Sequence, residues 1–263
     1  MRVLTESVKA FVRDLGADLV GVASAEAVDR EAREFQRPEG SLPGAQAVVS
    51  FGVRTLDSVF RSPNIRIARA SYVHYHHRID DLAWKVATYL EDRGFDAIPI
   101  PSTVPVEMKE RGGVLGDLSL RHAAVQAGLG RVGRSRNFLS PRFGARVRLG
   151  SVITTAPLAP DEPLDEEVCL GEACGRCLEA CPGQALDGET FAVKKCLSVM
   201  HKYNLYGLLK LLGRVLDAED LEEKKGLVFD GTLGEIYMSL RAGDPPLCIR
   251  CVEVCPVGRR GAR

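Results

Sequence analysis

The stretch that decides the fold is CLGEACGRCLEACP at residues 169–182, and CIRCVEVCP at residues 248–256 repeats its second half. Both stretches end in the spacing C-x2-C-x3-C-P, and the first adds Cys169 ahead of a four-residue gap. A lone cysteine, Cys196, stands between the two stretches. These eight cysteines are all that the chain contains, so they define a separate module after a long cysteine-free region.

The spacing of these cysteines is typical of iron-sulfur ligands. The two-residue gap lets neighbouring thiolates bind one cubane, whereas the three-residue gap directs the next thiolate to the other cluster of a two-cluster ferredoxin. The spacing therefore predicts two [4Fe-4S] clusters, with each motif giving its last cysteine to the other cluster. We assign Cys169, Cys174, Cys177 and Cys255 to cluster 1, and Cys181, Cys196, Cys248 and Cys251 to cluster 2.

Disulfides and zinc are the alternatives to iron-sulfur clusters. Disulfides belong to oxidising compartments, but the segment MRVLTESVKAFVRD at residues 1–14 carries charges throughout and lacks the apolar core of a secretory signal. Paired four-thiolate zinc sites usually show twin C-x2-C pairs, and tetrahedral zinc gives no role to the x3-Cys-Pro endings. Both alternatives are less favoured than clusters.

Composition excludes several classes of protein. Hydrophobic residues make up 45% of the 263 residues, and 35 Lys plus Arg balance 35 Asp plus Glu, so the global charge indicates neither nucleic acid nor a membrane surface. The apolar stretch AVVSFGV at residues 47–53 is far shorter than the ~20 residues of a membrane span. We expect a cytoplasmic protein, because oxygen-sensitive clusters favour a reducing compartment.

Residues 1–160 alternate helix and strand signals, which predicts an α/β (α+β) domain. The acidic, proline-bearing segment 157–168 reads as a linker to a cluster domain at residues 161–263. That second domain contains an insert at residues 197–247, whose first half is helical and apolar on one side and whose polar second half is expected to decorate the surface or act as a lid. The predicted helices are 4–15, 79–93 and 119–127, and the predicted strands are 18–23, 47–53, 96–101 and 147–155.

Three glycines satisfy the pattern G-x-G-x-x-G, namely Gly128, Gly130 and Gly133. A dinucleotide site requires a preceding strand and an acidic residue ~20 positions later, whereas this pattern follows a predicted helix and is answered by SVITT. A turn that ends the helix is therefore favoured over a nicotinamide site. Glycines in such a turn would still let some other ligand approach the backbone closely.

Six arginines follow these glycines within residues 131–148, a stretch without Asp or Glu. Such a local positive field could receive RNA phosphates, the phosphate of a nucleotide-tailed cofactor, or an acidic redox partner. A solvated surface with ion pairs to the acids at 161–167 is an equal alternative. The six are Arg131, Arg134, Arg136, Arg142, Arg146 and Arg148.

The segment YVHYHHR at residues 72–78 supplies imidazoles and phenols that could donate a proton or bind a metal. Alternation would direct His74 and His76 to one side of an extended segment. Because no carboxylate or cysteine stands at ligand spacing, polar loop residues are favoured over a metal site. Tyr75 and His76 remain proton-donor candidates.

The segment AGLGRVGRSRNFLSPRFGARVRLGSVIT at residues 127–154, together with both cysteine motifs and the lone cysteine in KKCLS, resembles the epoxyqueuosine reductase family. Members of that family, like the related reductive dehalogenases, hold cobalamin between a nitroreductase-like domain and a ferredoxin-like double-cluster domain. The resemblance implies the same two domains here, with a corrinoid near Gly128, Gly130, Gly133, Arg131 and Arg134. It also implies a low-potential electron donor of the ferredoxin or flavodoxin type.

The chain departs from that family at three places. Cys169 is followed by a gap of x4 where the family usually has x2. The family's catalytic Asp stands in a D-T-A-P-V type segment, whereas Asp117 lies in GDLSL, ten residues before Ala127, and is the substitute candidate. The helical-repeat extension by which longer members hold tRNA does not follow the last cysteine, which weighs against tRNA as a partner.

Three functions follow from these patterns. The leading one is an iron-sulfur oxidoreductase whose clusters pass electrons to a corrinoid for reductive chemistry, with Asp117, Tyr75 or His76 delivering protons. The second is an electron-transfer protein without a substrate of its own, which serves a partner such as a corrinoid enzyme. The third is an RNA-binding protein with structural clusters, supported by the arginine run.

Overall fold

The computed structural model describes residues 1–102, 109–111, 115–200, 203–243 and 248–259. The chain forms two compact units. The first consists of Met1–Asp57, Tyr75–Cys174 and Cys255–Arg263, and the second of Ser58–His74 and Gly175–Val254. The boundaries between these units lie after Asp57, His74, Cys174 and Val254, and none lies near residue 160. The division by function at residue 160 stays a prediction.

The first unit is built on a four-stranded antiparallel sheet in the order β1-β2-β6-β3. Its two central strands bury apolar side chains on both faces, and the buried hydroxyls of Ser50 and Ser151 meet at 3.0 Å where these strands pair. All four predicted strands are confirmed. Their bounds are Leu19–Ser24 for β1, Ala47–Arg54 for β2, Ala97–Ile100 for β3 and Val147–Thr154 for β6.

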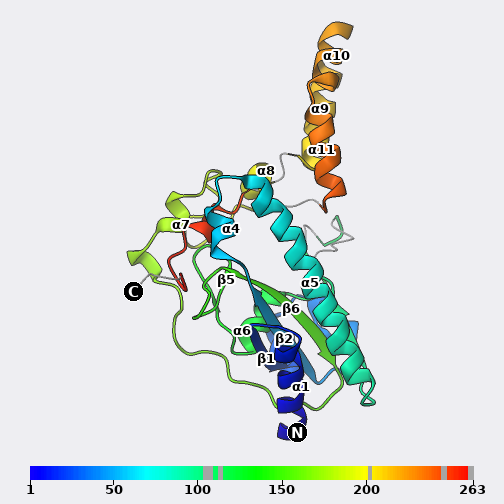
Figure 1. The fold of residues 1–263 in the computed structure, drawn as a ribbon, viewed down its shortest axis with the longest axis vertical. Coiled ribbons are helices and arrows are strands. Elements are labelled where there is room, and N and C mark those ends of the chain that lie inside the picture. Colours follow the sequence, from blue (N-terminus) through cyan, green and yellow to red (C-terminus); the bar gives the residue numbers. More distant parts are fainter. Residues whose placement is uncertain (103–108, 112–114, 201–202, 244–247, 260–263) are drawn as a thin grey trace. The chain divides into compact units, whose positions relative to one another are not determined.

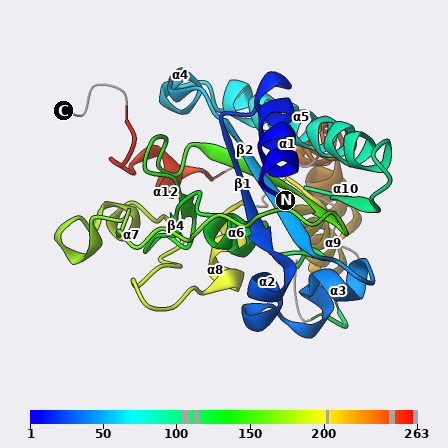
Figure 2. The same ribbon diagram turned by 90° about the horizontal axis from the view of Figure 1, so that it is seen from below.

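Helices cover both faces of this sheet. Helix α1 (Arg2–Asp14) and the part of α5 (Ile65–Glu91) that belongs to the first unit pack on one face, with Val8, Phe51 and Ile79 fully buried between them (Figure 1). Helices α2 (Ala25–Glu31) and α6 (Leu120–Gln126) pack on the other face, as Figure 2 shows for α1 and α2. The first unit is therefore a three-layer mixed α/β structure. Short elements complete it, namely η1 (Glu34–Gln36), α3 (Pro38–Ser41), β4 (Arg131–Val132), β5 (Phe138–Leu139) and η2 (Gly171–Ala173).

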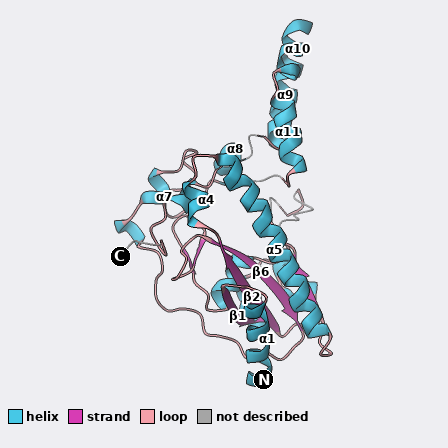
Figure 3. Ribbon diagram, viewed as in Figure 1, coloured by secondary structure: helices cyan, strands magenta, loops and turns pink. Residues whose placement is uncertain are grey.

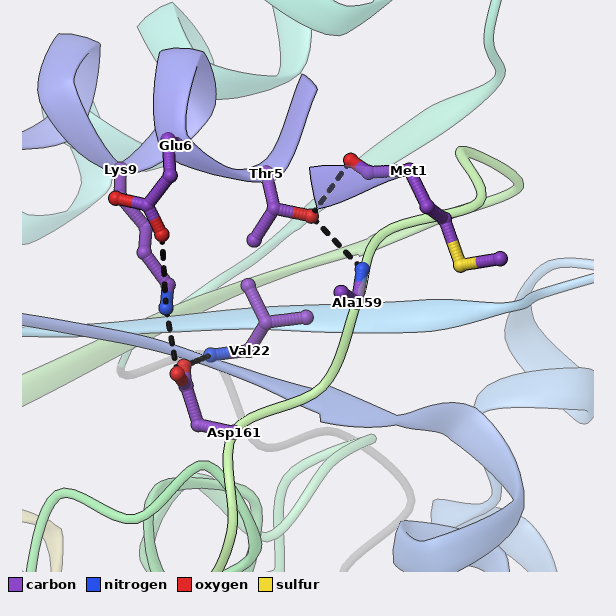
Figure 4. Close-up of polar contacts among 7 residues, drawn as sticks. All are labelled: Met1, Thr5, Glu6, Lys9, Val22, Ala159 and Asp161. Atoms are coloured by element: carbon purple, nitrogen blue, oxygen red, sulfur yellow. Dashed lines mark hydrogen bonds and ion pairs between the residues drawn. The ribbon is translucent and has the colours of Figure 1, made fainter. Parts of the chain in front are cut away.

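The predicted linker is held tightly on the first unit although it has no regular secondary structure (Figure 3). The carboxylate of Asp161 accepts a hydrogen bond from Lys9 Nζ at 2.5 Å and from the backbone N–H of Val22 at 2.8 Å (Figure 4). Nearby, the Ala159 N–H donates to Thr5 Oγ1 at 2.8 Å. The linker therefore covers the edge strand β1, which would otherwise present unpaired backbone groups.

The second unit is mainly helical where the structure describes it. The predicted apolar helix of the insert is confirmed as α9, and it packs with α10 and α11 through buried Leu211 and Ile236. The polar second half of the insert forms α10 and α11. The helices of this unit after residue 174 are α7 (Arg176–Glu179), α8 (Val193–Met200), α9 (Leu205–Asp217), α10 (Leu221–Phe229), α11 (Thr232–Arg241) and α12 (Arg250–Glu253), and α4 (Asp57–Arg61) begins at the boundary of the two units. Among the described helices, none is long and apolar enough to cross a bilayer.

One local prediction is wrong. The segment 72–78 is neither extended nor a loop but part of α5. Since successive residues of a helix are rotated by about 100°, His74 and His76 point to different sides rather than to one. Helix α5 begins at Ile65, well ahead of Ile79, where the regular apolar spacing starts. Polar and aromatic residues in the N-terminal part of the helix hide the helical period in the sequence.

Candidate metal centre

The two C-x2-C-x3-C-P motifs form matching local structures. Each motif places its second C-x2-C cysteine on a one-turn helix, Cys177 on α7 (RCLE) and Cys251 on α12 (RCVE). Gly175, which precedes α7, has a φ of 56°, a left-handed conformation that glycine adopts without strain. The two short helices contact each other within the second unit. The sequence repeat is therefore also a structural pair.

The four cysteines predicted to bind cluster 2 are brought together in the second unit. Burial, and then charge repulsion from the neighbouring thiols of Cys251, Cys248 and Cys181, raise the pKa of the Cys196 thiol to about 11. This electrostatic coupling shows that Cys196, on α8, lies near the other three. Four thiols that repel one another as anions are suited to a cationic iron centre, because a bound metal deprotonates its thiol ligands.

Polar contacts around these sulfurs also fit a cluster. The backbone N–H of Ala185 donates to Cys181 Sγ at 3.3 Å, the kind of contact that tunes iron-sulfur potentials. None of the eight cysteines, all of which lie in described parts of the chain, forms a disulfide bond. In the part of the chain that the structure describes, no three His, Cys, Asp or Glu side chains are close enough to hold a single metal ion. Cluster ligands each bind a different iron, so they stand farther apart than the ligands of one ion.

The ligands predicted for cluster 1 are distributed over both units. Cys169, Cys174 and Cys255 belong to the first unit and Cys177 to the second, so the structure does not gather these four within one unit. Cys255 is buried, and Cys169 Sγ lies 3.4 Å from the place where a Cβ on Gly133 would stand. The cluster 1 assignment stays a prediction from the spacing.

The arginine run does not form one exposed positive face. Arg146 is only 3% exposed, so the expectation that it contributes to a surface field is wrong. Arg131 forms an ion pair with Glu167 at 3.2 Å, as expected from the alternative of pairing with the acids at 161–167. Burial lowers the pKa of Arg146, whereas the charges of Asp57 and Cys255 act in the opposite direction.

The three glycines of G-x-G-x-x-G have packing roles. Gly128 ends the turn after α6 with a φ of 70°, which confirms the helix-ending turn. A Cβ on Gly128 would lie 2.4 Å from the Glu162 carbonyl oxygen, and a Cβ on Gly130 would lie 2.1 Å from the Leu139 carbonyl oxygen. At Gly133 a Cβ would lie 2.5 Å from Leu139 Cδ1. Protein atoms therefore occupy the space that these glycines were expected to leave for a corrinoid.

A cavity of about 710 Å³ lies in the first unit beside the linker. Its lining is rich in carboxylates, which suits a cationic ligand better than a phosphate-bearing one. None of the five residues expected to hold a corrinoid lines it. The lining residues are Pro141, Glu162, Pro163, Leu164, Asp165, Glu166, Glu167, Val168 and Val257.

Two of the proton-donor candidates have structural partners. Tyr75 is buried, and its hydroxyl oxygen accepts a hydrogen bond from the Leu56 N–H at 3.0 Å. Asp117 accepts a hydrogen bond from Arg111 Nη1 at 2.7 Å, and its side chain is 40% exposed. Both contacts hold backbone or loop segments in place.

His76 has the most perturbed environment of the three candidates. Burial, and then the positive charge of Arg148, lower the pKa of His76 to about 4, although Asp80 acts in the opposite direction. Its Nδ1 lies 2.9 Å from Ser102 Oγ, and the Ser102 N–H donates to Asp80 Oδ1 at 2.9 Å. The imidazole is therefore neutral at pH 7 and coupled to a hydroxyl. Nothing in the sequence pattern links Ser102 to a histidine 26 positions away.

No family model matches this sequence. Individual relatives are nevertheless similar to it. An epoxyqueuosine reductase of Bacillus cereus is 26% identical over 226 residues, which covers 75% of this chain and 56% of that protein. An epoxyqueuosine reductase of Staphylococcus aureus is 31% identical over 176 residues, covering 62% and 42%. A tetrachloroethene reductive dehalogenase of Desulfitobacterium hafniense is 30% identical over 136 residues, covering 51% and 22%. The chain thus spans about half the length of the epoxyqueuosine reductases that it resembles.

Solved structures share the fold. An epoxyqueuosine reductase of Streptococcus thermophilus aligns with a TM-score of 0.61 at 19% identity, covering 97% of this chain and 66% of that one. A second, bound to an epoxyqueuosine-modified stem loop of tRNA-Tyr, aligns with a TM-score of 0.56 at 20% identity, covering 76% and 57%. A reductive dehalogenase for which a B12-dependent mechanism is described aligns with a TM-score of 0.56 at 19% identity, covering 90% and 36%. The mixed α/β fold of this chain is that of epoxyqueuosine reductases.

Proposed function

We propose that this chain, given its similarity to epoxyqueuosine reductases and reductive dehalogenases, is an iron-sulfur reductase that holds two [4Fe-4S] clusters. The observation that carries the proposal is that Cys196 lies near Cys181, Cys248 and Cys251 in the second unit. These are the four cysteines that the spacing alone assigns to cluster 2. The proximity of Cys196 to the other three thiols supports this assignment.

The chain's own residues would divide the work as follows. The eight thiolates bind iron, and backbone amides such as that of Ala185 stabilise charge on the sulfurs. When bound, the clusters supply single electrons taken from a low-potential donor of the ferredoxin or flavodoxin type. Residues 1–160 would form a nitroreductase-like domain and residues 161–263 a ferredoxin-like domain, as the resemblance implies.

A corrinoid would be the acceptor of these electrons, by analogy with the B12-dependent dehalogenase. The residues expected to hold it do not form an open cradle, because protein atoms occupy the space beside Gly128, Gly130 and Gly133, and Arg131 pairs with Glu167. The proposal of a corrinoid therefore depends on the similarity alone. The substrate class proposed by the same similarity is an epoxide in a modified tRNA nucleoside.

Protons for the reduction would come from the neutral pair His76 and Ser102 rather than from an imidazolium. His76 Nδ1 and Ser102 Oγ lie 2.9 Å apart and would act as a relay, in which each group takes up a proton from a donor nearer the surface as it gives one up, so that neither an alkoxide nor an imidazolium forms. Asp117 and Tyr75 remain secondary proposals for this role.

The decisive experiment is metal and sulfide analysis of protein purified without oxygen, together with electron paramagnetic resonance after reduction by dithionite. We expect about eight irons and eight sulfides per chain. Cys196→Ser should lose the signal of one cluster and keep that of the other, whereas Ser198→Ala, an exposed position on the same helix, should change neither. Stoichiometric zinc in place of iron would contradict the proposal.

A cobalamin titration of the cluster-loaded protein then separates a reductase from an electron carrier. Stoichiometric binding, with cobalt reduced after dithionite is added, supports a reductase, and epoxyqueuosine-containing tRNA is the first substrate to test. Clusters that reduce reversibly without any cobalamin binding would instead indicate an electron-transfer protein that serves a partner.

A further inference from the structure

Arg146 is a buried cation with three defined partners, all in the first unit. Its Nε lies 2.9 Å from Asp57 Oδ1, its Nη1 donates to the Cys255 carbonyl oxygen at 2.9 Å, and its Nη2 donates to the Val257 carbonyl oxygen. The Arg146 side chain is 4% exposed and that of Asp57 is 20% exposed. A guanidinium is taken out of water at such a site only when carboxylate and carbonyl oxygens replace its hydration.

The backbone of the last cysteine motif is fixed at the same place. Gly144, with a φ of 56°, lets the loop ahead of β6 touch the chain after Cys255, because a Cβ on Gly144 would lie 2.0 Å from the Val257 carbonyl oxygen. A Cβ on Gly258 would lie 2.4 Å from Gly144 N. Direct backbone contact and the fork of Arg146 therefore hold Cys255 on the first unit.

This arrangement puts a full positive charge next to a predicted cluster ligand. Arg146 interacts electrostatically with the Cys255 thiol as well as with Asp57. Asp57 contacts the guanidinium on the Nε side, whereas both Nη atoms face the cysteine segment. The positive charge of Arg146 thus acts on Cys255 at short range. The negative charge of Asp57 opposes it, because Asp57 contacts the same guanidinium.

We propose that Arg146 and Asp57 form a positioning pair that sets the reduction potential of the cluster bound by Cys255. The inference depends on the proposed function, since it requires that Cys255 bind iron. Reduction adds one electron and no proton to the cluster, so its negative charge increases by one. A nearby cation stabilises that reduced state and raises the potential, and a nearby carboxylate lowers it.

The test compares variants of opposite sign in the cluster-loaded protein. Potentiometric titration followed by electron paramagnetic resonance gives the midpoint of each cluster. Arg146→Gln should shift one midpoint to a more negative potential, and Asp57→Asn should shift the same midpoint to a more positive one. The other midpoint should stay within error of its unmodified value. The matched control is Arg142→Gln, an exposed arginine four positions earlier that stacks on Phe143 and should move neither midpoint.

Iron analysis keeps the two proposals apart. If the unmodified protein binds no iron, the proposed function fails and not only this inference. If it binds about eight irons while Arg146→Gln and Asp57→Asn leave both midpoints unchanged or shift them in the same direction, the tuning role is overturned. If the Arg146→Gln variant does not retain its cluster, the midpoint potentials of Arg146→Lys and Asp57→Asn test the tuning role instead. A lysine variant near the unmodified midpoint together with a positive shift in Asp57→Asn supports the role, and an unmoved Asp57→Asn overturns it.

Discussion

Replacing Asp161 by Asn should loosen the contact between the linker and the edge strand β1, because it removes the carboxylate that faces a buried ammonium. The Lys9 side chain is 10% exposed and that of Asp161 is 34% exposed, and their charged atoms lie 2.5 Å apart. Removing one partner of a fully buried pair costs about 3–5 kcal/mol. Since a third of Asp161 is exposed, we expect about 2 kcal/mol for Asp161→Asn.

Replacing the other partner, Lys9, should lower the local stability less. Lys9→Met removes the ammonium and keeps the packing of its methylene groups, while Asp161 still accepts the Val22 N–H and contacts water. We expect a loss of about 1 kcal/mol or less. The double variant should be more stable than Asp161→Asn alone, because it removes the buried ammonium that Asp161→Asn leaves with only the exposed Glu6 carboxylate at 3.8 Å.

Amide hydrogen exchange of the native protein measures this local stability at Val22 and Ala159. A loss of about 2 kcal/mol corresponds to roughly 30-fold faster exchange under conditions where opening is at equilibrium. The control Asp81→Asn breaks the ion pair between Asp81, which is 60% exposed, and Lys85, which is 52% exposed. It should change amide exchange near that pair about twofold. Equal effects of Asp161→Asn and Lys9→Met, or an effect of Asp161→Asn as small as the control, would refute the reasoning.

Two further predictions concern His76 and Gly130. The folded pKa of His76 is about 4, below its ordinary 6.5, so the unfolded chain binds the proton first. The free energy of unfolding should be highest above pH 6.5 and should fall by roughly 3 kcal/mol as the pH drops towards 4. His76→Gln should remove this dependence and the exposed His77→Gln should keep it, as followed by thermal unfolding between pH 7 and 4.5. Gly130→Ala places a Cβ 2.1 Å from a backbone oxygen and should lower the melting temperature, whereas Gly226→Ala, with open space inside α10, should raise it slightly. Equal melting temperatures for the two alanine variants would contradict the packing role of Gly130.

The sequence by itself determined the features that depend on short-range periodicity. Each of the four predicted strands is present, and the helix ending at Gly128 ends where its left-handed glycine predicted. The pattern failed at residues 72–78, where aromatic and histidine residues hide the helical period of α5. Periods of 2 and 3.6 residues identify which face is buried only when polar and apolar residues separate cleanly.

The cysteine spacing determined more than a local structure. Because a two-residue gap suits one cubane and a three-residue gap does not, the spacing predicted which four thiols belong to cluster 2. In the coordinates, Cys196 lies near Cys181, Cys248 and Cys251. The C-x2-C pair is encoded locally, whereas the full ligand set, which joins cysteines from both motifs and Cys196, stays a prediction.

Only the tertiary structure decided which distant side chains meet. Arg146 and the Cys255 carbonyl are 109 positions apart, and Lys9 and Asp161 are 152 apart. The sequence presented Arg146 as one member of a positive run, whereas in the structure it is a buried cation beside Cys255, a predicted cluster ligand. The physical reason is that the energy of a charge depends on what replaces its water, and the packing of elements far apart in the chain supplies those replacements.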